Sequence, residues 1–355
     1  MNLAVSSRDV LDEALRSCRA VDSAVLYGSV ARGDAESYSD IDLLVVCDEE
    51  KKLTVYDELY RRLSPHFKKL SLCIYGPKEL RFLAKAGSLF LLHLQKEAIP
   101  LLDHSGLLSE VLDGFEIKSS YDDDFVKSLE LISPLDTAVY GAPNQLHRLA
   151  YTYSLFRVYG VYLLAQDRVF EFSKAKMAAT LVEKNPSQAK NVTQLSSLRV
   201  LNTNFFTGEP SSGQARSVVA DLSLLRQSTA ALGELVGRTF DVTERSYYAA
   251  VQEFLAACAG SPSALGYRMR SWFLLLIYDG LNLYARSHRR QELTSFSEDA
   301  LLELTDPGVP KPVIAAAAQG LSYIRNYHVK YFFSEERRIR ADKACRLLEG
   351  LTAFA

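Results

Sequence analysis

The hydrophobic pattern of the chain changes its period near residue 120. Up to that point short apolar runs of strand character alternate with helical patterns, whereas long helical patterns fill the rest of the chain. A length of 355 residues with 48% hydrophobic residues suffices for two cores. The sequence therefore predicts an α+β protein, in which a small mixed-sheet domain at residues 1–110 precedes a larger all-α helical domain at residues 120–355.

The apolar spacing also predicts the elements of each domain. The first domain is expected to contain, in order, a helix over 7–20, strands over 23–27 and 40–47, a helix over 51–64 and a strand over 70–75. The second is expected to contain helices over 144–165, 173–184, 215–237, 245–258, 264–287, 313–332 and 335–352. Stretches rich in Gly, Pro and Ser at 203–214 and 259–264 are the places where these helices could divide into two groups. The residues around His147 and Arg148 are interpreted as helix core, with the lining of a cleft as the alternative.

The segment from Leu26 to Val46, LYGSVARGDAESYSDIDLLVV, carries a pattern of polar residues suited to chemistry. Asp40 and Asp42 stand one residue apart at the start of a strand, so their side chains project to the same side. Two neighbouring carboxylates repel each other unless a cation lies between them, and hard oxygen ligands suit Mg²⁺ or Mn²⁺. The spacing therefore predicts a divalent metal at Asp40 and Asp42.

The turn at Gly28 and Ser29 supplies a complementary group. Glycine lets the backbone approach a ligand closely, and a serine hydroxyl and backbone N–H groups can hold phosphate oxygens. Metal and phosphate together suit attack on the α-phosphorus of a nucleotide. We therefore expect an NMP or dNMP to move from an NTP or dNTP to an acceptor hydroxyl, with release of pyrophosphate. The alternative is that the turn and the two acids are ordinary features of solvated strand ends.

The segments GSVARG (28–33) and SDIDLLVV (39–46) together resemble the motif of nucleotidyltransferases of the DNA polymerase β superfamily, especially minimal nucleotidyltransferases and antibiotic adenylyltransferases. The resemblance covers roughly the first hundred residues. It implies that Gly28 and Ser29 bind the nucleotide phosphates and that Asp40 and Asp42 bind the catalytic metal. Arg32 and Ser39 are further candidates for nucleotide binding, and they complete this set: Gly28, Ser29, Arg32, Ser39, Asp40 and Asp42.

The resemblance fails at one position. Members of the family usually carry a third acidic residue on the next core strand, where Ser71 or Cys73 occupies the expected place in this chain. Neither side chain replaces a carboxylate as a hard ligand or as a base at neutral pH. Three explanations stay open: an acid from elsewhere, such as the run Asp122 to Asp124, completes the site; the acceptor needs little deprotonation; or the chain is a nucleotide-binding or partner-binding module with weak turnover.

The second domain bears on the acceptor. The helix start Phe172 to Lys176 is similar to one in antibiotic adenylyltransferases, which makes Lys174 a candidate triphosphate ligand, with an ordinary surface lysine as the alternative. The acceptor could be a nucleotide or oligonucleotide, a protein or a small molecule, and fold alone does not separate these classes. Basic residues at 286–290 and 325–346 slightly favour a nucleotide or oligonucleotide, with a solvated helix face as the alternative interpretation. A protein partner and a role in prokaryotic stress or phage defence (antiviral defence) are hypotheses by analogy.

Composition excludes other classes of protein. The net charge of −2 gives no global attraction to nucleic acid or to an anionic membrane. The five cysteines lie far apart without a CxxC pair, which argues against a disulfide scaffold or a zinc site and fits a reducing cytoplasm. The longest apolar run is too short to cross a bilayer, so we expect no membrane insertion.

Overall fold

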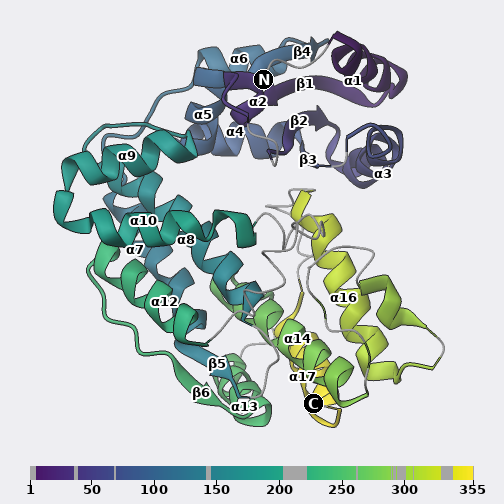
Figure 1. Cartoon of the computed structure of the whole chain (residues 1–355). Helices are drawn as coiled ribbons and strands as arrows, with labels where there is room; N and C mark the ends of the chain where they lie inside the picture. The colour runs from purple at the N-terminus through teal and green to yellow at the C-terminus, as the bar shows by residue number, and fades with distance from the viewer. Residues whose placement is uncertain are drawn as a thin grey trace. The chain divides into compact units, whose positions relative to one another are not determined.

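The computed structural model describes residues 5–35, 39–67, 69–140, 145–202, 222–260, 263–288, 290, 293, 301–306, 308–328 and 339–354. The chain forms two compact units (Figure 1). Among the described residues, the first unit contains 5–120 and also 325–328, the last turn of a helix that otherwise belongs to the second unit, and the second contains 121–324 and 339–354. The expected boundary segment 203–214 lies outside the described residues.

The first unit is built on a four-stranded mixed sheet, which confirms the α+β class. Its strands are β1 (Val21–Tyr27), β2 (Ile41–Cys47), β3 (Leu70–Tyr75) and β4 (Ile99–Asp103). They lie in the order β3-β2-β1-β4, with β1 antiparallel to both of its neighbours and β2 parallel to β3. The alternation of side chains along each strand gives the sheet two apolar faces, and both are covered by helices.

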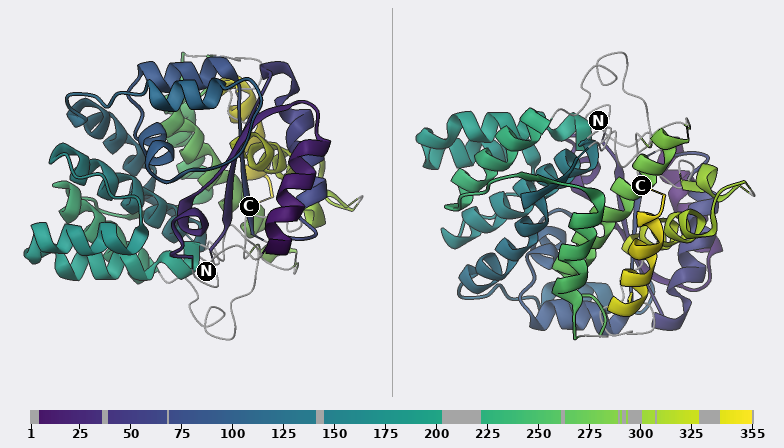
Figure 2. Two further views of the ribbon diagram at one scale, coloured as in Figure 1. Left: turned by 90° about the horizontal axis from the view of Figure 1, so that it is seen from above. Right: turned by 90° about the horizontal axis from the view of Figure 1, so that it is seen from below.

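Helices α1 (Val5–Ser17) and α3 (Lys52–Leu63) pack on one face of this sheet (Figure 2). Leu43 and Val45 of β2 point into this core and are fully buried among helix residues such as Leu11 and Leu59. The opposite face packs against α5 (Leu89–Glu97), whose Phe90 ring lies 5.7 Å from that of Tyr75. The remaining helices of the unit are α2 (Gly28–Arg32), α4 (Pro77–Lys85) and α6 (Leu107–Asp113), with a 3-10 turn η1 (Glu49–Lys51).

The second unit is helical. Its helices are α7 (Asp122–Ser128), α8 (Leu146–Gln166), α9 (Lys174–Lys184), α10 (Ala189–Ser197), α12 (Leu222–Val236), α13 (Tyr247–Cys258), α14 (Tyr267–Ser287), α16 (Lys311–His328) and α17 (Ala341–Thr352), joined by 3-10 turns η2 (Leu129–Asp136), η3 (Pro186–Gln188) and η4 (Glu303–Thr305). Two three-residue strands, β5 (Thr137–Val139) and β6 (Thr243–Arg245), form a parallel pair that the helical periodicity does not predict. Because the pair is short, it leaves the helical character of the unit unchanged.

A buried polar cluster ties α8 to α14. The guanidinium of Arg148 donates to both carboxylate oxygens of Asp279, at 2.8 and 2.6 Å, and Nε of Arg148 donates to the Thr137 carbonyl at 3.1 Å. His147 lies beside them with its ring 4.4 Å from that of Tyr278. His147 and Arg148 are buried, which confirms their interpretation as core residues.

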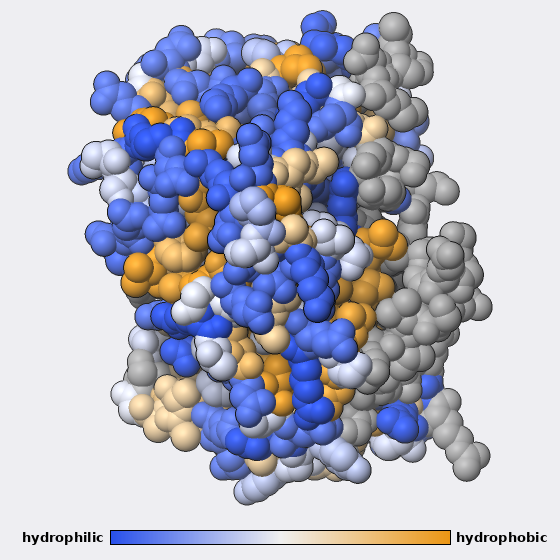
Figure 3. All heavy atoms as spheres, turned by 60° about the vertical axis from the view of Figure 1, so that its left-hand side comes forward, coloured by the Kyte–Doolittle hydropathy of each residue, from blue (hydrophilic) through white to orange (hydrophobic). Residues whose placement is uncertain are grey.

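The surface mixes polar and apolar side chains. On the face shown in Figure 3, hydrophilic residues in blue surround smaller groups of hydrophobic residues in orange. Among the residues that the structure describes, no helix combines the length and the apolar character needed to span a membrane.

Candidate active site

Strand pairing brings the two halves of the sequence motif together. Strand β1 ends at Tyr27, and Tyr27 pairs with Asp42, the second residue of the neighbouring strand β2. Helix α2 begins at the next residue, Gly28. Antiparallel strands place the end of one beside the start of the other, so the Gly28-Ser29 turn and Asp42 meet at one edge of the sheet.

Gly28 lies directly against the carboxylate of Asp42. Its φ of +74° belongs to the left-handed region, which favours glycine. A Cβ at this position would lie 3.1 Å from Cγ of Asp42 and closer still to Oδ2, so a side chain there would have to displace this carboxylate or the backbone. Glycine lets the backbone lie against the carboxylate without such a shift, and Ser29 is the next residue.

Asp40 and Asp42 are both partly exposed at this edge. Ile41 between them packs on the core beneath α1 and α3, so alternation along the strand directs the two acids away from that core. Ser39 is also partly exposed, and the residues 36–38 before it lie outside the described part of the chain. The chain thus offers two carboxylates and one hydroxyl over four consecutive residues.

The register of β3 shows which side chains lie beside Asp42 on the same face of the sheet. Ser71 pairs with Asp42 and Cys73 pairs with Leu44, so both side chains share the face of Asp42. Cys73 is buried, and the Tyr27 hydroxyl donates to its Sγ at 3.5 Å. Burial raises the pKa of Tyr27 well above its usual range, and the nearby Cys73 and Asp42 raise it further, so this hydroxyl stays protonated. Among the described residues, no three acidic, His or Cys side chains gather as metal ligands.

Arg32, at the end of α2, forms ion pairs with two carboxylates. Its Nη1 lies 2.6 Å from Oε2 of Glu97, and its Nε lies 3.2 Å from Asp34. His93 places Nε2 at 2.7 Å from the same Oε2 of Glu97. Burial alone would lower the pKa of Arg32, but Glu97 and Asp34 outweigh it and raise that pKa, so the guanidinium is charged. The sequence motif points to Arg32 but gives no sign of Glu97 and His93, which follow it by more than sixty residues.

Two other predicted groups belong to the second unit. Lys174 is the first residue of α9, after Ser173 at the N-cap position. The acidic run Asp122 to Asp124 forms the first turn of α7, where carboxylates favour the positive end of the helix dipole, and Asp122 accepts a hydrogen bond from Gln166 at 2.8 Å. This local arrangement gives the acidic run a structural role, and its part in the metal site stays a prediction. The role of Lys174 stays a prediction.

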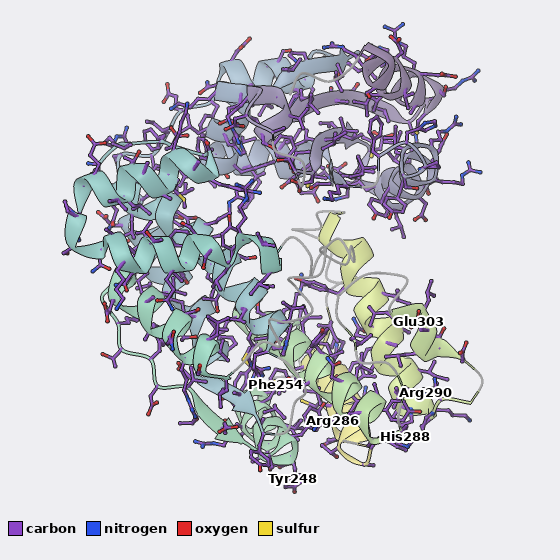
Figure 4. The ribbon with its side chains drawn as sticks, in the orientation of Figure 1. Tyr248, Phe254, Arg286, His288, Arg290 and Glu303 are labelled. Carbon is purple, nitrogen blue, oxygen red and sulfur yellow. The ribbon has the colours of Figure 1, made fainter. Side chains whose placement is uncertain are left out.

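The basic residues near the end of α14 have a local explanation as well. Arg286 lies in the last turn of α14, and His288 and Arg290 follow it (Figure 4). The negative end of the helix dipole stabilises a positive charge such as that of Arg286. Arg289 and residues 329–338 of the basic tail lie outside the described residues.

Comparison with known proteins agrees with the motif. Residues 8–88 match the family model described as a nucleotidyltransferase domain. No curated protein matches the chain. The matched residues include the whole of β1, α2, β2 and β3, and hence Gly28, Ser29, Arg32, Ser39, Asp40 and Asp42. This part of the chain is therefore a nucleotidyltransferase domain, consistent with the polymerase β type.

Proposed function

We propose that the protein is a metal-dependent nucleotidyltransferase (EC 2.7.7 type), which moves an NMP or dNMP from an NTP or dNTP to an acceptor hydroxyl. The observation that carries this proposal is the contact between the Gly28 backbone and the Asp42 carboxylate within a nucleotidyltransferase domain. Gly28 and Ser29 would hold phosphate oxygens, and Arg32 and Ser39 would add contacts to the nucleotide. The acceptor oxygen would attack the α-phosphorus, the bond to the β-phosphate would break, and pyrophosphate would leave.

The acids at the end of the sheet fit a magnesium or manganese ion that the nucleotide helps to hold. Asp40 and Asp42 supply hard oxygen ligands, and Mg²⁺ is commonly bound by one or two carboxylates together with substrate phosphates and water. A divalent cation in this place would neutralise charge on the triphosphate during transfer. The two-carboxylate set therefore suits an ion that binds together with the NTP.

The acceptor hydroxyl stays open between a nucleotide or oligonucleotide, a protein and a small molecule. The basic residues at the end of α14 favour a polyanionic acceptor, although their position at a helix end also explains them. The large helical unit favours a protein with more than a minimal nucleotidyltransferase domain, in which this unit would help to bind the acceptor or a protein partner. A cytoplasmic location and a role in stress or phage defence belong to the same proposal, by analogy only.

A second candidate function is nucleotide binding without efficient transfer. Ser71 opposite Asp42 favours it, because a hydroxyl is a weak base at neutral pH. In that case the domain would bind NTP and metal and signal to a partner.

One experiment separates the two functions. The full chain is incubated with each labelled NTP and dNTP and with Mg²⁺ or Mn²⁺, and pyrophosphate, labelled protein and oligomers are resolved. Label on the protein indicates a protein acceptor, and a ladder indicates an oligonucleotide acceptor. Nucleotide binding without pyrophosphate release across all acceptors favours the binding module. Activity that survives substitution of Asp40 and Asp42 by alanine would remove the proposed site.

A further inference from the structure

Arg32 is held by two carboxylates that differ strongly in their surroundings. The side chain of Glu97 is 10% exposed and lies 2.6 Å from Nη1, whereas that of Asp34 is 39% exposed and lies 3.2 Å from Nε. An exposed ion pair is weak, because water competes for both charges. A pair shielded from water is costly to break, because its separation leaves a charge without compensation. An incoming anion would therefore replace Asp34 far more easily than Glu97.

Glu97 is itself fixed by a second contact. Its Oε2 accepts from both Arg32 and His93, and the His93 ring packs edge-on against Tyr27 with 5.6 Å between ring centroids. Tyr27 directly precedes Gly28, the first residue of α2, and Arg32 is the last residue of this helix. Residues of α5 therefore contact the chain at both ends of α2: His93 contacts Tyr27, and Glu97 contacts Arg32. Burial would raise the pKa of Glu97, but His93 and Arg32 outweigh it and lower that pKa, so the carboxylate stays ionised.

We propose that Glu97, backed by His93, positions Arg32 for the nucleotide, and that Asp34 is the counter-ion that the triphosphate displaces. This inference rests on the proposed function, because it takes Arg32 as a phosphate ligand. Glu97 and His93 follow the matched residues 8–88, so the family match does not include them. Arg32 donates from Nε to Asp34 and from Nη1 to Glu97, and a phosphate would take the place of Asp34 at Nε while Nη1 keeps Glu97.

The two carboxylates should affect nucleotide affinity in opposite directions. Removing the charge of residue 34 with Asp34→Asn removes the competitor, so affinity should rise about threefold, the size of a weak exposed pair. Glu97→Gln removes the anchor, so affinity should fall about tenfold or more. Both effects should vanish in an Arg32→Ala background, because each acts through the guanidinium. A purely structural role of Glu97 would instead persist in that background.

The test is calorimetric titration of the full chain with inorganic tripolyphosphate and with ATP, GTP, CTP and UTP, each with Mg²⁺. The matched control is Asp48→Asn, which removes a carboxylate that is 70% exposed and pairs with Lys51 at 3.0 Å. Equal effects of the substitutions at 34 and 48 would indicate a general charge effect and overturn the proposal. An unchanged or lower affinity after Asp34→Asn would overturn it too. Asp34 is exposed, so this variant and its Arg32→Ala double decide the question even if Glu97→Gln does not fold.

Two outcomes for the wild-type protein distinguish the positioning role of Glu97 from the proposed nucleotidyl transfer. A wild-type protein that binds none of the five probes would overturn both. A wild-type protein that binds NTP and releases pyrophosphate, with affinities insensitive to residues 34 and 97, would overturn the positioning role alone.

Discussion

The carboxylate of Asp42 occupies the space in which a side chain on residue 28 would lie. Gly28 begins α2 directly after β1, and Asp42 lies on the neighbouring strand β2. An added Cβ on Gly28 would lie 3.3 Å from Cβ of Asp42 and nearer to its carboxylate. A methyl group there must displace the acid or the backbone. Gly28 also has a φ of +74°, which costs an L-residue about 1 kcal/mol.

We expect Gly28→Ala to reduce nucleotidyl transfer by at least about a hundredfold, because misplacement of a reacting group by about 1 Å has an effect of this size. The matched control is Gly106→Ala. Gly106 has the same φ of +74°, and nothing lies within 4 Å of an added Cβ there. Both variants should lose stability from backbone strain, measured by thermal unfolding, and Gly28→Ala should lose more because of the clash with Asp42. Only Gly28→Ala should lose transfer. Equal activity of the two would show that the contact with Asp42 has no part in the reaction.

Neutral replacement of either acid should remove the metal site. Asp40→Asn and Asp42→Asn are each expected to lower the transfer rate by about a thousandfold or more, because charge stabilisation by the ion contributes several kcal/mol. Pyrophosphate release measures the rate, and Asp48→Asn serves as the control for loss of one exposed carboxylate. A variant at 40 or 42 that keeps wild-type turnover would contradict the assignment.

A carboxylate at residue 71 should supply the third acidic residue that the family usually carries on this strand. Ser71 is partly exposed and pairs with Asp42, so Ser71→Asp places a third acid beside the first two. If the absent base limits turnover, the rate should rise by about a hundredfold, as for general base catalysis. Three adjacent carboxylates repel each other, so this variant should unfold at a lower temperature without Mg²⁺ than with it. An unchanged rate together with tight NTP binding would favour the binding module.

The metal should bind together with the nucleotide. Two carboxylates without a third protein ligand hold Mg²⁺ weakly, whereas triphosphate oxygens complete its octahedral shell. Titration of the protein with Mn²⁺, followed by electron paramagnetic resonance, should show weak binding alone and much tighter binding after a non-hydrolysable NTP is added. Tight binding of Mn²⁺ to the nucleotide-free protein would point to a further ligand and contradict the two-carboxylate site.

The sequence predicts the local part of this site well. Short apolar runs locate β1, β2 and β3, and glycine chemistry identifies the turn at Gly28. The closeness of Gly28 to Asp42 follows from the antiparallel pairing of β1 with β2, which a strand–turn–strand pattern favours. Strand β4 and helix α5 are absent from the prediction, because Ala98 to Asp103 and the largely apolar run before it show no clear period of two or of 3.6.

Contacts between distant residues are the part that the sequence does not reveal. Arg32 meets Glu97 only because α2 packs on α5, and Arg148 meets Asp279 across 131 positions. The sequence pattern around a single helical arginine is the same whether its side chain faces water or pairs with a buried acid. Packing decides between the two, and packing depends on the whole chain.

The buried cluster of the second unit makes the stability of the protein sensitive to pH through His147. Burial, assisted by the charge of Arg148, lowers the pKa of His147 to about 4, although Asp279 acts in the opposite direction. The imidazole is therefore neutral in the folded protein at pH 5 but largely protonated in an unfolded chain, whose histidine pKa is about 6.5. Since the unfolded state binds the extra proton, the free energy of unfolding falls as the pH drops from about 6.5 toward 4.

Replacement of this imidazole by an amide should therefore flatten the acid side of the stability profile. Between pH 7 and pH 5 we expect the wild-type protein to lose on the order of 1 to 2 kcal/mol through His147. In the His147→Gln variant, the free energy of unfolding should fall by about 1 to 2 kcal/mol less than in the wild type between pH 7 and pH 5, measured by urea unfolding at each pH. His66→Gln controls for the loss of an exposed histidine. A wild-type slope in the His147 variant, or an equally flattened slope in the His66 variant, would show that protonation of the buried imidazole is not the cause.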